Sequence, residues 1–300
     1  MSEKKDHNHS SRKNLLAATI LNLIISVAEL IGGVLSGSLA LFSDALHNLG
    51  DAFSTFIALI ANIVAGKENT PKRTFGYKRI EILAALLNSV ILIGITIYLF
   101  VEAVERLKNP QEINSLLMLI VAGIGLIANI IAVFILHKDS KHSLNVKAAY
   151  LHLIGDSLSS VVVIIGGLLI YFFRLYWIDP VVSFVIGIYI LYEAVKILDE
   201  AVKILMQNTP PGLDISEVKN VIEEDPRIRT MHHIHAWNLT DQRIHFEAHV
   251  DVFDDFHLSE VDKIRKDVEK ILTEKFTIDH ITLQFEYQAC EDEMIKEKDK

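Results

Sequence analysis

Six long runs of apolar residues dominate this chain, and each is long enough to cross a lipid bilayer. They cover residues 15–35, 39–65, 80–104, 116–136, 148–173 and 181–205. A membrane-spanning helix needs about 20 mostly apolar residues, because backbone polar groups in hydrocarbon must be paired within the segment. The first run is too long, and too closely followed by the next, to be a cleaved secretory signal. The sequence therefore predicts an all-α membrane domain of six spanning helices over residues 14–206.

Lysine and arginine residues lie mostly on one side of these predicted spans. They precede the first span and fill the second-to-third and fourth-to-fifth loops: Lys4, Lys5, Arg12, Lys13, Lys67, Lys72, Arg73, Lys78, Arg79, Lys138, Lys141 and Lys147. The opposite loops contain only Arg106, Lys108 and Arg174. Because basic loops stay in the cytoplasm, both termini are expected there, including the short segment 1–13. The lack of a targeting segment indicates a bacterial plasma membrane.

The string Leu-His-x-x-Gly-Asp occurs twice, at residues 46–51 and 151–156. In each copy the His and the Asp (His47 and Asp51, His152 and Asp156) are four residues apart, which puts both side chains on one face of a helix. Ionisable groups in hydrocarbon are costly and usually mark an ion or proton path. One such pair could be a helix–helix hydrogen bond or a metal-free proton relay. Two pairs that converge would form the His2Asp2 ligand set that zinc accepts.

The two copies of the motif are 105 residues apart, in the second and fifth predicted spans. This spacing predicts two related halves of three helices, of which the second is inverted, so that these two spans run antiparallel. Gly50 and Gly155 are expected to let a neighbouring helix approach closely. Asp44 is expected to orient a His from outside the metal shell. Glu29, in the first span, is either a structural hydrogen-bond acceptor or part of a release path.

These motifs resemble the cation diffusion facilitators, and in particular the zinc-transporting branch that includes bacterial zinc, cadmium and cobalt efflux proteins. The resemblance rests on residues 43–51, on His152 and Asp156, and on residues 75–85, and it covers about residues 13–287. It implies a homodimeric, proton-coupled antiporter that exports a divalent metal from the cytoplasm. Some relatives have a further His-bearing metal site between the second and third spans. Residues 66–77 contain no His, so no metal site is expected in that loop.

From residue 207 onward the chain contains no run long enough to span a membrane. Its patterning predicts a helix at 214–224, strands at 229–239 and 243–253, a helix at 258–276 and a strand at 279–287. The resemblance implies that this α+β domain, residues 207–290, is a cytoplasmic dimerisation and metal-binding domain. Residues 291–300 read as a charged tail.

Most of the remaining histidines lie in this cytoplasmic domain. By resemblance, His235, His249 and Glu286 match positions that bind zinc in some relatives. Gln284 stands where those relatives have another His, which argues against a full two-metal centre. Alternation along the second strand places His245, Glu247, His249 and Asp251 on the face opposite the apolar residues. The alternative is a solvated sheet face that is rich in His. A solvated role without a specific site is also expected for His7, His9, His137 and His142.

Charge and cysteine content exclude several other classes of protein. The single Cys290 excludes an intramolecular disulfide framework and a thiolate cluster. The net charge of −9 comes mostly from the last hundred residues and does not favour binding to nucleic acid, which would need a basic stripe. The partners expected are therefore a lipid bilayer, divalent metal ions and a second copy of the chain.

The chemistry of His47, Asp51, His152 and Asp156 suggests a mechanism of alternating access. Carboxylates offset the dehydration of a dication, and neutral imidazoles favour zinc over magnesium or calcium. Metal must displace protons from its ligands, and an imidazole with a pKa of ~6.5 changes charge near neutral pH. Competition between zinc and H+ would thus couple the two flows.

Two rival functions stay open at this stage. An intramembrane metal-dependent hydrolase would need an open metal position and a general base, typically on a His-Glu-x-x-His helix, and that string is absent from the sequence. A membrane-anchored metal sensor would bind metal in the cytoplasmic domain alone. It leaves the paired ligands within the spans unexplained.

Overall fold

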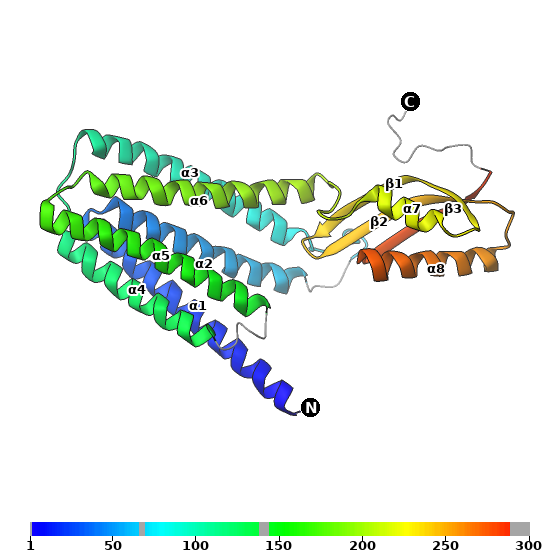
Figure 1. The fold of residues 1–300 in the computed structure, drawn as a ribbon, viewed down its shortest axis with the longest axis horizontal. Coiled ribbons are helices and arrows are strands. Elements are labelled where there is room, and N and C mark those ends of the chain that lie inside the picture. Colours follow the sequence, from blue (N-terminus) through cyan, green and yellow to red (C-terminus); the bar gives the residue numbers. More distant parts are fainter. Residues whose placement is uncertain (1, 66–69, 138–143, 289–300) are drawn as a thin grey trace. The chain divides into compact units, whose positions relative to one another are not determined.

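The structure is a computed structural model that describes residues 2–65, 70–137 and 144–288. The chain divides into two compact units. The first unit comprises Met1–Ile60 and Ala84–Leu198, and the second comprises Ala61–Leu83 and Asp199–Lys300. The long helices are α1 (Ser2–Ser36), α2 (Leu39–Ala65), α3 (Ile80–Lys108), α4 (Ser115–His137), α5 (Leu144–Phe173) and α6 (Ile178–Leu205) (Figure 1).

Five of these helices are long and apolar enough to cross a membrane. They are α1 over Ala18–Ser36, α3, α4, α5 over Ala149–Phe173, and α6. α2 is a helix of 27 residues whose first half carries Asp44, His47, Asn48 and Asp51, and several side chains of its second half lie outside the described residues. The helices coincide with the predicted apolar runs and extend several of them by one turn or more. Among the described residues, five helices therefore have the length and composition of membrane spans.

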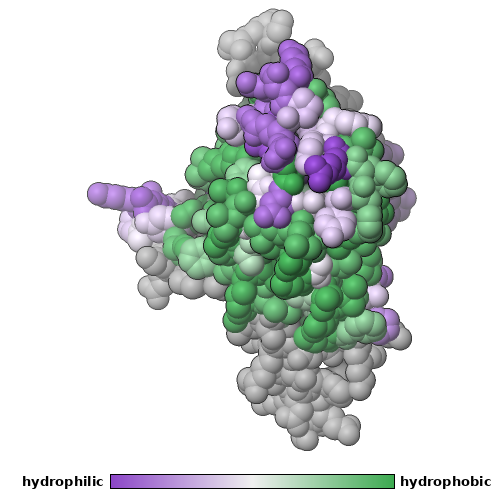
Figure 2. Space-filling model, turned by 90° about the vertical axis from the view of Figure 1, so that its left-hand side faces the viewer, coloured by the Kyte–Doolittle hydropathy of each residue, from purple (hydrophilic) through white to green (hydrophobic). Residues whose placement is uncertain are grey.

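The surface of the helical unit is strongly apolar. Large side chains such as Ile24, Phe134 and Phe172 are exposed, with 74% of Phe134 accessible. Figure 2 shows one end of the molecule, where hydrophobic side chains surround a smaller hydrophilic area. Monomeric soluble proteins rarely expose apolar patches of this extent, so this surface fits a lipid environment.

The start of α2 is fixed by a side chain from α6. The carboxylate of Asp179 accepts hydrogen bonds from the Ser38 hydroxyl (2.6 Å) and from the backbone N–H groups of Leu39 (2.7 Å) and Ala40 (3.2 Å). These N–H groups lack partners within the helix, and a negative charge at this end also interacts favourably with the helix dipole. Asp179 is fully buried. It therefore sets the position of the helix that carries the first His-x-x-x-Asp pair.

The second unit contains α7 (Ile215–Glu223), β1 (Ile228–Thr240), β2 (Arg243–Val252), α8 (Leu258–Phe276) and β3 (His280–Tyr287). The sheet order is β1-β2-β3, with β1 and β2 antiparallel and β2 and β3 parallel. The predicted α-β-β-α-β order is confirmed, and α8 has the predicted bounds. α7 begins after Asp214, whose side chain accepts hydrogen bonds from the backbone N–H groups of Ser216 and Glu217. Apolar residues from α7, α8 and all three strands form the core of this second unit.

Two details of the sheet differ from simple strand alternation. β1 shifts register between His232 and His235, and the intervening His233 has a left-handed backbone with φ of 50°. On β2, His245 and Asp251 are buried, so the alternative of a solvated sheet face is wrong for these two residues. His245 is covered by the rings of Trp237, Phe75 and His280, and Asp251 pairs with Arg229. Tertiary partners on other segments thus override the alternation.

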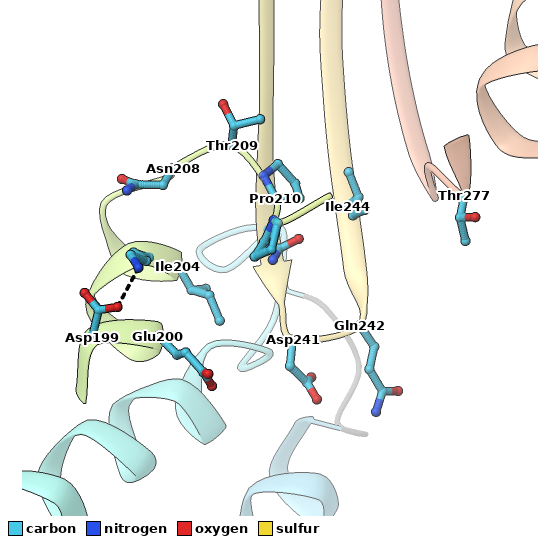
Figure 3. Close-up of a pocket in the computed structure, with 13 residues that line it drawn as sticks. Asp199, Glu200, Ile204, Asn208, Thr209, Pro210, Asp241, Gln242, Ile244 and Thr277 are labelled. Carbon is cyan, nitrogen blue, oxygen red and sulfur yellow. Dashed lines mark hydrogen bonds and ion pairs between the residues drawn. The ribbon is translucent and has the colours of Figure 1, made fainter. Parts of the chain in front are cut away.

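A cavity of about 540 Å³ lies in the second unit between the end of α6 and the turn that joins β1 to β2. Figure 3 shows Asp199, Glu200, Asp241 and Gln242 among the side chains that line it. Lys203 donates to Asp199 at 2.5 Å. The side chains of the cavity are largely exposed and include none of the predicted metal ligands.

Candidate metal centres

The two His-x-x-x-Asp pairs come together from α2 and α5. Nε2 of His152 lies 3.3 Å from Oδ2 of Asp51 and 3.6 Å from Oδ2 of Asp156, and Nε2 of His47 lies 3.5 Å from Oδ2 of Asp51. The rings of His47 and His152 have centroids 6.2 Å apart. All four side chains predicted from the repeat therefore meet in one place.

These distances suit a shared ion. Two donors bound to zinc at about 2.0–2.1 Å, separated by a tetrahedral angle, are themselves about 3.3–3.4 Å apart. The three nitrogen–oxygen separations in this group are 3.3, 3.5 and 3.6 Å. Each pair contributes an imidazole nitrogen next to a carboxylate oxygen. Three edges of the tetrahedron that a His2Asp2 site needs are therefore present, as a chain of contacts from His47 through Asp51 and His152 to Asp156, whereas the four donors are not all within 4.8 Å of one another.

α2 and α5 run antiparallel, as the inverted repeat predicted. The side chain of Asp51 contacts His152, while Asp44, two turns earlier on α2, contacts Ser159, two turns later on α5. A step toward the N-terminus of α2 therefore corresponds to a step toward the C-terminus of α5. This direction makes the His of one motif the neighbour of the Asp of the other.

Burial differs among the four side chains. The side chains of Asp156 and His47 are 2% and 9% exposed, whereas those of Asp51 and His152 are 30% and 40% exposed. Oδ2 of Asp156 is buried and has no hydrogen-bond partner among the described residues. A buried carboxylate oxygen that faces an imidazole without bonding to it is well placed to bind a cation. An ion would reach the group from the side of Asp51 and His152.

Asp44 has a different role from the predicted one. It is buried, and its carboxylate accepts hydrogen bonds from the hydroxyl groups of Ser159 and Ser160 (3.4 Å for the latter). The sequence predicted that Asp44 orients a His. In the described part of the chain its hydrogen bonds go to these serines, so it ties α2 to α5 beside the His2Asp2 group.

The two motif glycines are not equivalent. A Cβ atom on Gly50 would lie 2.7 Å from Cδ2 of Leu92 on α3, so the predicted close approach is confirmed there. A Cβ on Gly155 would meet no described atom within 4 Å, so the prediction is wrong for Gly155. One further neighbour escaped sequence reasoning. The ring of Tyr189 on α6 packs edge-on against His47, with centroids 5.6 Å apart, and no motif marks that position.

A second group of metal-binding side chains lies in the cytoplasmic domain. Ligand atoms of His232, His249 and Glu286 all lie within 4.8 Å of one another. Oε1 of Glu286 is 2.7 Å from Nδ1 of His249, and Oε2 is 3.3 Å from Nε2 of His232. Nδ1 of His232 is buried and has no hydrogen-bond partner within the described chain. Two imidazoles and a carboxylate leave a fourth position open, which is typical of zinc sites that also bind water.

Two members of this group, His249 and Glu286, are among the predicted ligands. The third member is His232, and the predicted His235 is not part of the group. β1 pairs His232 directly with His249, whereas His235 pairs with Glu247 and is exposed. The register shift leaves His232 and His235 on the same face of the sheet, but His235 stands beside Glu247, further from Glu286, and a sequence pattern does not reveal a bulge of this kind. Gln284, on β3, pairs with His249 of β2. Its side-chain amide donates a hydrogen bond of 2.7 Å to Oε1 of Glu286.

The other histidines give no comparable cluster among the described residues. Nδ1 of His137 lies 3.3 Å from the hydroxyl of Tyr150. The side chains of His7 and His9 and all of His142 lie outside the described residues. Residues 70–77 of the second-to-third loop hold no metal-binding group, whereas the rest of the predicted loop, 66–69, is not described.

Comparison with known proteins agrees with this division of the chain. Residues 15–206 match the cation efflux transmembrane domain, and residues 210–288 match the cation efflux protein cytoplasmic domain. The chain belongs to the cation efflux family. Its resemblance to the zinc-transporting branch of the cation diffusion facilitators is thereby confirmed.

Named relatives in the cation efflux family cover nearly the whole chain. A cadmium, cobalt and zinc/H(+)-K(+) antiporter of Bacillus subtilis (strain 168) is 38% identical and covers 98% of both chains. The metal cation efflux system protein CzcD of Cupriavidus metallidurans is 38% identical over 95% of this chain and 90% of its own. The zinc transporter ZitB of Escherichia coli (strain K12) is 35% identical over 95% of this chain and 93% of its own. This is a family of membrane transporters for metal ions rather than of enzymes.

Proposed function

We propose that this protein exports a divalent transition metal, most readily Zn2+ and also Cd2+ or Co2+, from the cytoplasm in exchange for protons. The transported ion binds between α2 and α5 to His47, Asp51, His152 and Asp156. The observation that carries the proposal is the 3.3 Å separation of His152 from Asp51, which joins the two motifs into one ligand set.

The choice of metal follows from the donor types. Two carboxylates neutralise a dication in a low-dielectric site, and two imidazoles select against Mg2+ and Ca2+, which prefer oxygen ligands. The printed names of the relatives in Bacillus subtilis and Escherichia coli include zinc, and the former also includes cadmium and cobalt. Zinc, cadmium and cobalt are likewise proposed as the ions that this protein transports.

The membrane topology is proposed to include α2 as a sixth span. Five helices are apolar enough on their own, and α2 lies among them with its start bound to Asp179 on α6. Its polar face meets that of α5 rather than lipid. An even number of spans places both termini on the same side, which the basic loops identify as the cytoplasm. The host membrane proposed is a bacterial plasma membrane.

Proton coupling is proposed to follow from competition at the ligands. His47 and His152 must be neutral to bind metal, so each can carry a proton when the ion leaves. Opening toward the outside would release metal into a more acidic medium and protonate the vacated ligands. Opening toward the cytoplasm would return those protons as the next ion binds. The name of the relative from Bacillus subtilis includes H(+).

The cytoplasmic domain is proposed to join two copies of the chain and to bind Zn2+ as a regulator. The matched cytoplasmic domain family is consistent with dimerisation. His232, His249 and Glu286 would hold the ion, with His235 outside this set. An ion that binds one conformation of the dimer more tightly would shift the transporter's conformational equilibrium.

The experiment that tests this function is metal flux into proteoliposomes that contain the purified full-length protein. Zinc, cadmium, cobalt, iron and manganese are compared side by side, with an internal pH dye to record proton counterflow. Zinc uptake with opposite proton movement is the expected result. Zinc binding without any flux would instead support the alternative function, a membrane-anchored metal sensor that uses His232, His249 and Glu286.

A further inference from the structure

A small basic cavity lies in the second unit and includes none of the proposed metal ligands. Its volume is about 230 Å³, and its walls come from the segment before α3, the segment after α6 and strand β1. The lining residues are Phe75, Gly76, Lys78, Arg79, Gln207, Trp237 and Leu239. Both charged residues in this set are basic, and none is acidic. The cavity therefore favours an anionic ligand.

The charge of Arg79 has no counter-charge in the described part of the chain. Its Nε atom is buried and has no hydrogen-bond partner there, and no described carboxylate forms an ion pair with its guanidinium. A guanidinium stays protonated in proteins, so Arg79 cannot escape this cost by losing its charge. A buried donor without a partner destabilises the protein until a ligand binds it. The unpaired Nε of Arg79 thus points to a missing anion.

The neighbouring side chains leave the positive charge of this cavity uncompensated. Gln207 is the wall residue contributed by the segment after α6, and its amide is neutral. A carboxylate at the same position would pair with Arg79 and close the cavity to an anion. Arg73 is not a lining residue, because its guanidinium lies over the ring of Tyr77, 4.3 Å from the centroid.

The position of the cavity along the chain places it at the membrane surface. α3 begins at Ile80, directly after Arg79, and α6 ends at Leu205, two residues before Gln207. Both helices are among the five with the length and composition of membrane spans. Residues at the ends of spans lie at the level of the lipid headgroups, and basic pockets at such positions bind anionic headgroups.

Aromatic side chains form the rest of the wall. The rings of Phe75 and Trp237 pack on the ring of His245, with centroids 5.4 and 5.5 Å away. Phe75 is nevertheless 51% exposed. Aromatic rings are enriched where a membrane protein meets the headgroup region, because they combine an apolar body with a preference for that layer. Their presence favours a lipid over a fully soluble anion.

We propose that this cavity binds the phosphate group of an anionic phospholipid. Arg79 offers a planar fork of donors that matches two phosphate oxygens, Lys78 adds a second positive charge, and the amide of Gln207 is a further donor. The volume is below the range of about 300–1,000 Å³ that is typical of pockets for larger ligands, which argues against a nucleotide. The leaflet would be the cytoplasmic one, and this detail alone rests on the topology proposed above.

The test is a binding titration of the full-length protein in a neutral detergent. The chain has two tryptophans, so Trp177→Phe leaves Trp237, in the cavity wall, as the only fluorescent reporter of this kind. The ligands are dihexanoyl phosphatidylglycerol, dihexanoyl phosphatidylcholine and inorganic phosphate, compared at equal ionic strength and without metal. Saturable binding of phosphatidylglycerol is expected, with at least about tenfold weaker binding of the other two. Equal binding of the two lipids, or binding of inorganic phosphate as tight as that of phosphatidylglycerol, would overturn the proposal.

Three variants in this background test the contacts. Arg79→Gln should weaken binding of phosphatidylglycerol about tenfold or more, because it removes the charged fork. Gln207→Glu removes no basic residue but supplies a carboxylate that competes for Arg79, and it should also weaken binding. Lys72→Gln is the matched control, since it removes one positive charge from the same loop at an exposed position outside the cavity.

The control should bind phosphatidylglycerol like the parent protein. Size-exclusion profiles and helix content establish that each variant is folded. Unchanged affinity in Arg79→Gln, or an equal loss of affinity in Lys72→Gln, would show that the cavity does not bind the lipid. Because no metal is present in these titrations, their outcome is separate from the success or failure of the proposed metal transport.

Discussion

Nε2 of His152, on α5, lies 3.3 Å from Oδ2 of Asp51, on α2. The two residues belong to different copies of the same motif, so the candidate site is assembled across the inverted repeat. Neither copy provides a complete ligand set, because each supplies one imidazole and one carboxylate. This division makes the contribution of each residue separately testable.

Replacing either carboxylate should abolish zinc transport. Asp51→Ala or Asp156→Ala removes a charged ligand from the proposed site, so the initial flux should fall at least about 100-fold. Flux into proteoliposomes measures this, and size-exclusion chromatography checks that each variant remains folded and dimeric. Asp199→Ala is the control, because that carboxylate is exposed and pairs with Lys203 on the same helix. Transport by either ligand variant at the parent rate would refute the assignment.

Replacing both imidazoles should change the selectivity. His47→Asp combined with His152→Asp creates an all-carboxylate site, which suits more oxygen-preferring ions such as manganese. The zinc-to-manganese flux ratio is expected to fall about tenfold or more. Competition between the two metals in the same liposomes gives the ratio directly. An unchanged ratio would place the selectivity filter elsewhere.

Removing the cytoplasmic domain separates the two metal locations. Deletion of residues 214–300 leaves His47, Asp51, His152 and Asp156 intact, so the truncated protein should still bind zinc, with slower transport and weaker dimerisation. Calorimetric titration of truncated and full-length protein in detergent gives the comparison. If a folded truncation bound no zinc at all, the sensor function would be favoured over transport.

Within the cytoplasmic domain, the effects of single His substitutions should follow the structure. His232→Ala and His249→Ala each remove a donor from the group around Glu286 and should weaken zinc binding at least about tenfold. His235→Ala should leave it unchanged, since that side chain is exposed and pairs with Glu247 rather than with His249. Zinc titrations of the full-length protein, made in an Asp51→Ala background, isolate this site. The reverse order of effects would show that His235 is the ligand.

Acidification should destabilise the cytoplasmic sheet through His245. Burial lowers the pKa of His245, and the nearby His280, Lys78 and Arg243 add to this effect, whereas Asp279 opposes it. The folded state then binds fewer protons than the unfolded state at pH values between the lowered pKa and about 6.5, so stability falls as the pH drops through that range. His245→Phe should flatten this dependence, and His235→Phe, at an exposed position, should not. Hydrogen exchange of the β1 and β2 amides across this range provides the measurement, and equal pH dependence in both variants would contradict the prediction.

Much of this architecture was predictable because it depends on local patterns. The bounds of α8 follow from apolar spacing, and the pairing of α2 with α5 follows from a motif that is repeated in the chain. Other features depend on contacts between distant residues. Asp179 caps α2 from a position 140 residues away from Leu39, and no sequence period reveals such a partner.

The errors have the same origin. The bulge in β1 puts His232 and His235 on the same face of the sheet, and it is His232, not His235, that lies opposite His249. Gly155 was expected to contact a helix because Gly50 does, yet the inverted halves have different neighbours.

The hydrogen bonds from Ser159 and Ser160 to Asp44 constrain how the protein can move. They join α5 to α2 about two turns from the point where His152 meets Asp51. Sliding one helix past the other by a single turn, about 5.4 Å, would break these bonds and the ligand set together. We therefore expect α2 and α5 to move together as one rigid body. Access to the ion would then change through displacement of the remaining helices around it, with the ligands kept in register throughout the cycle.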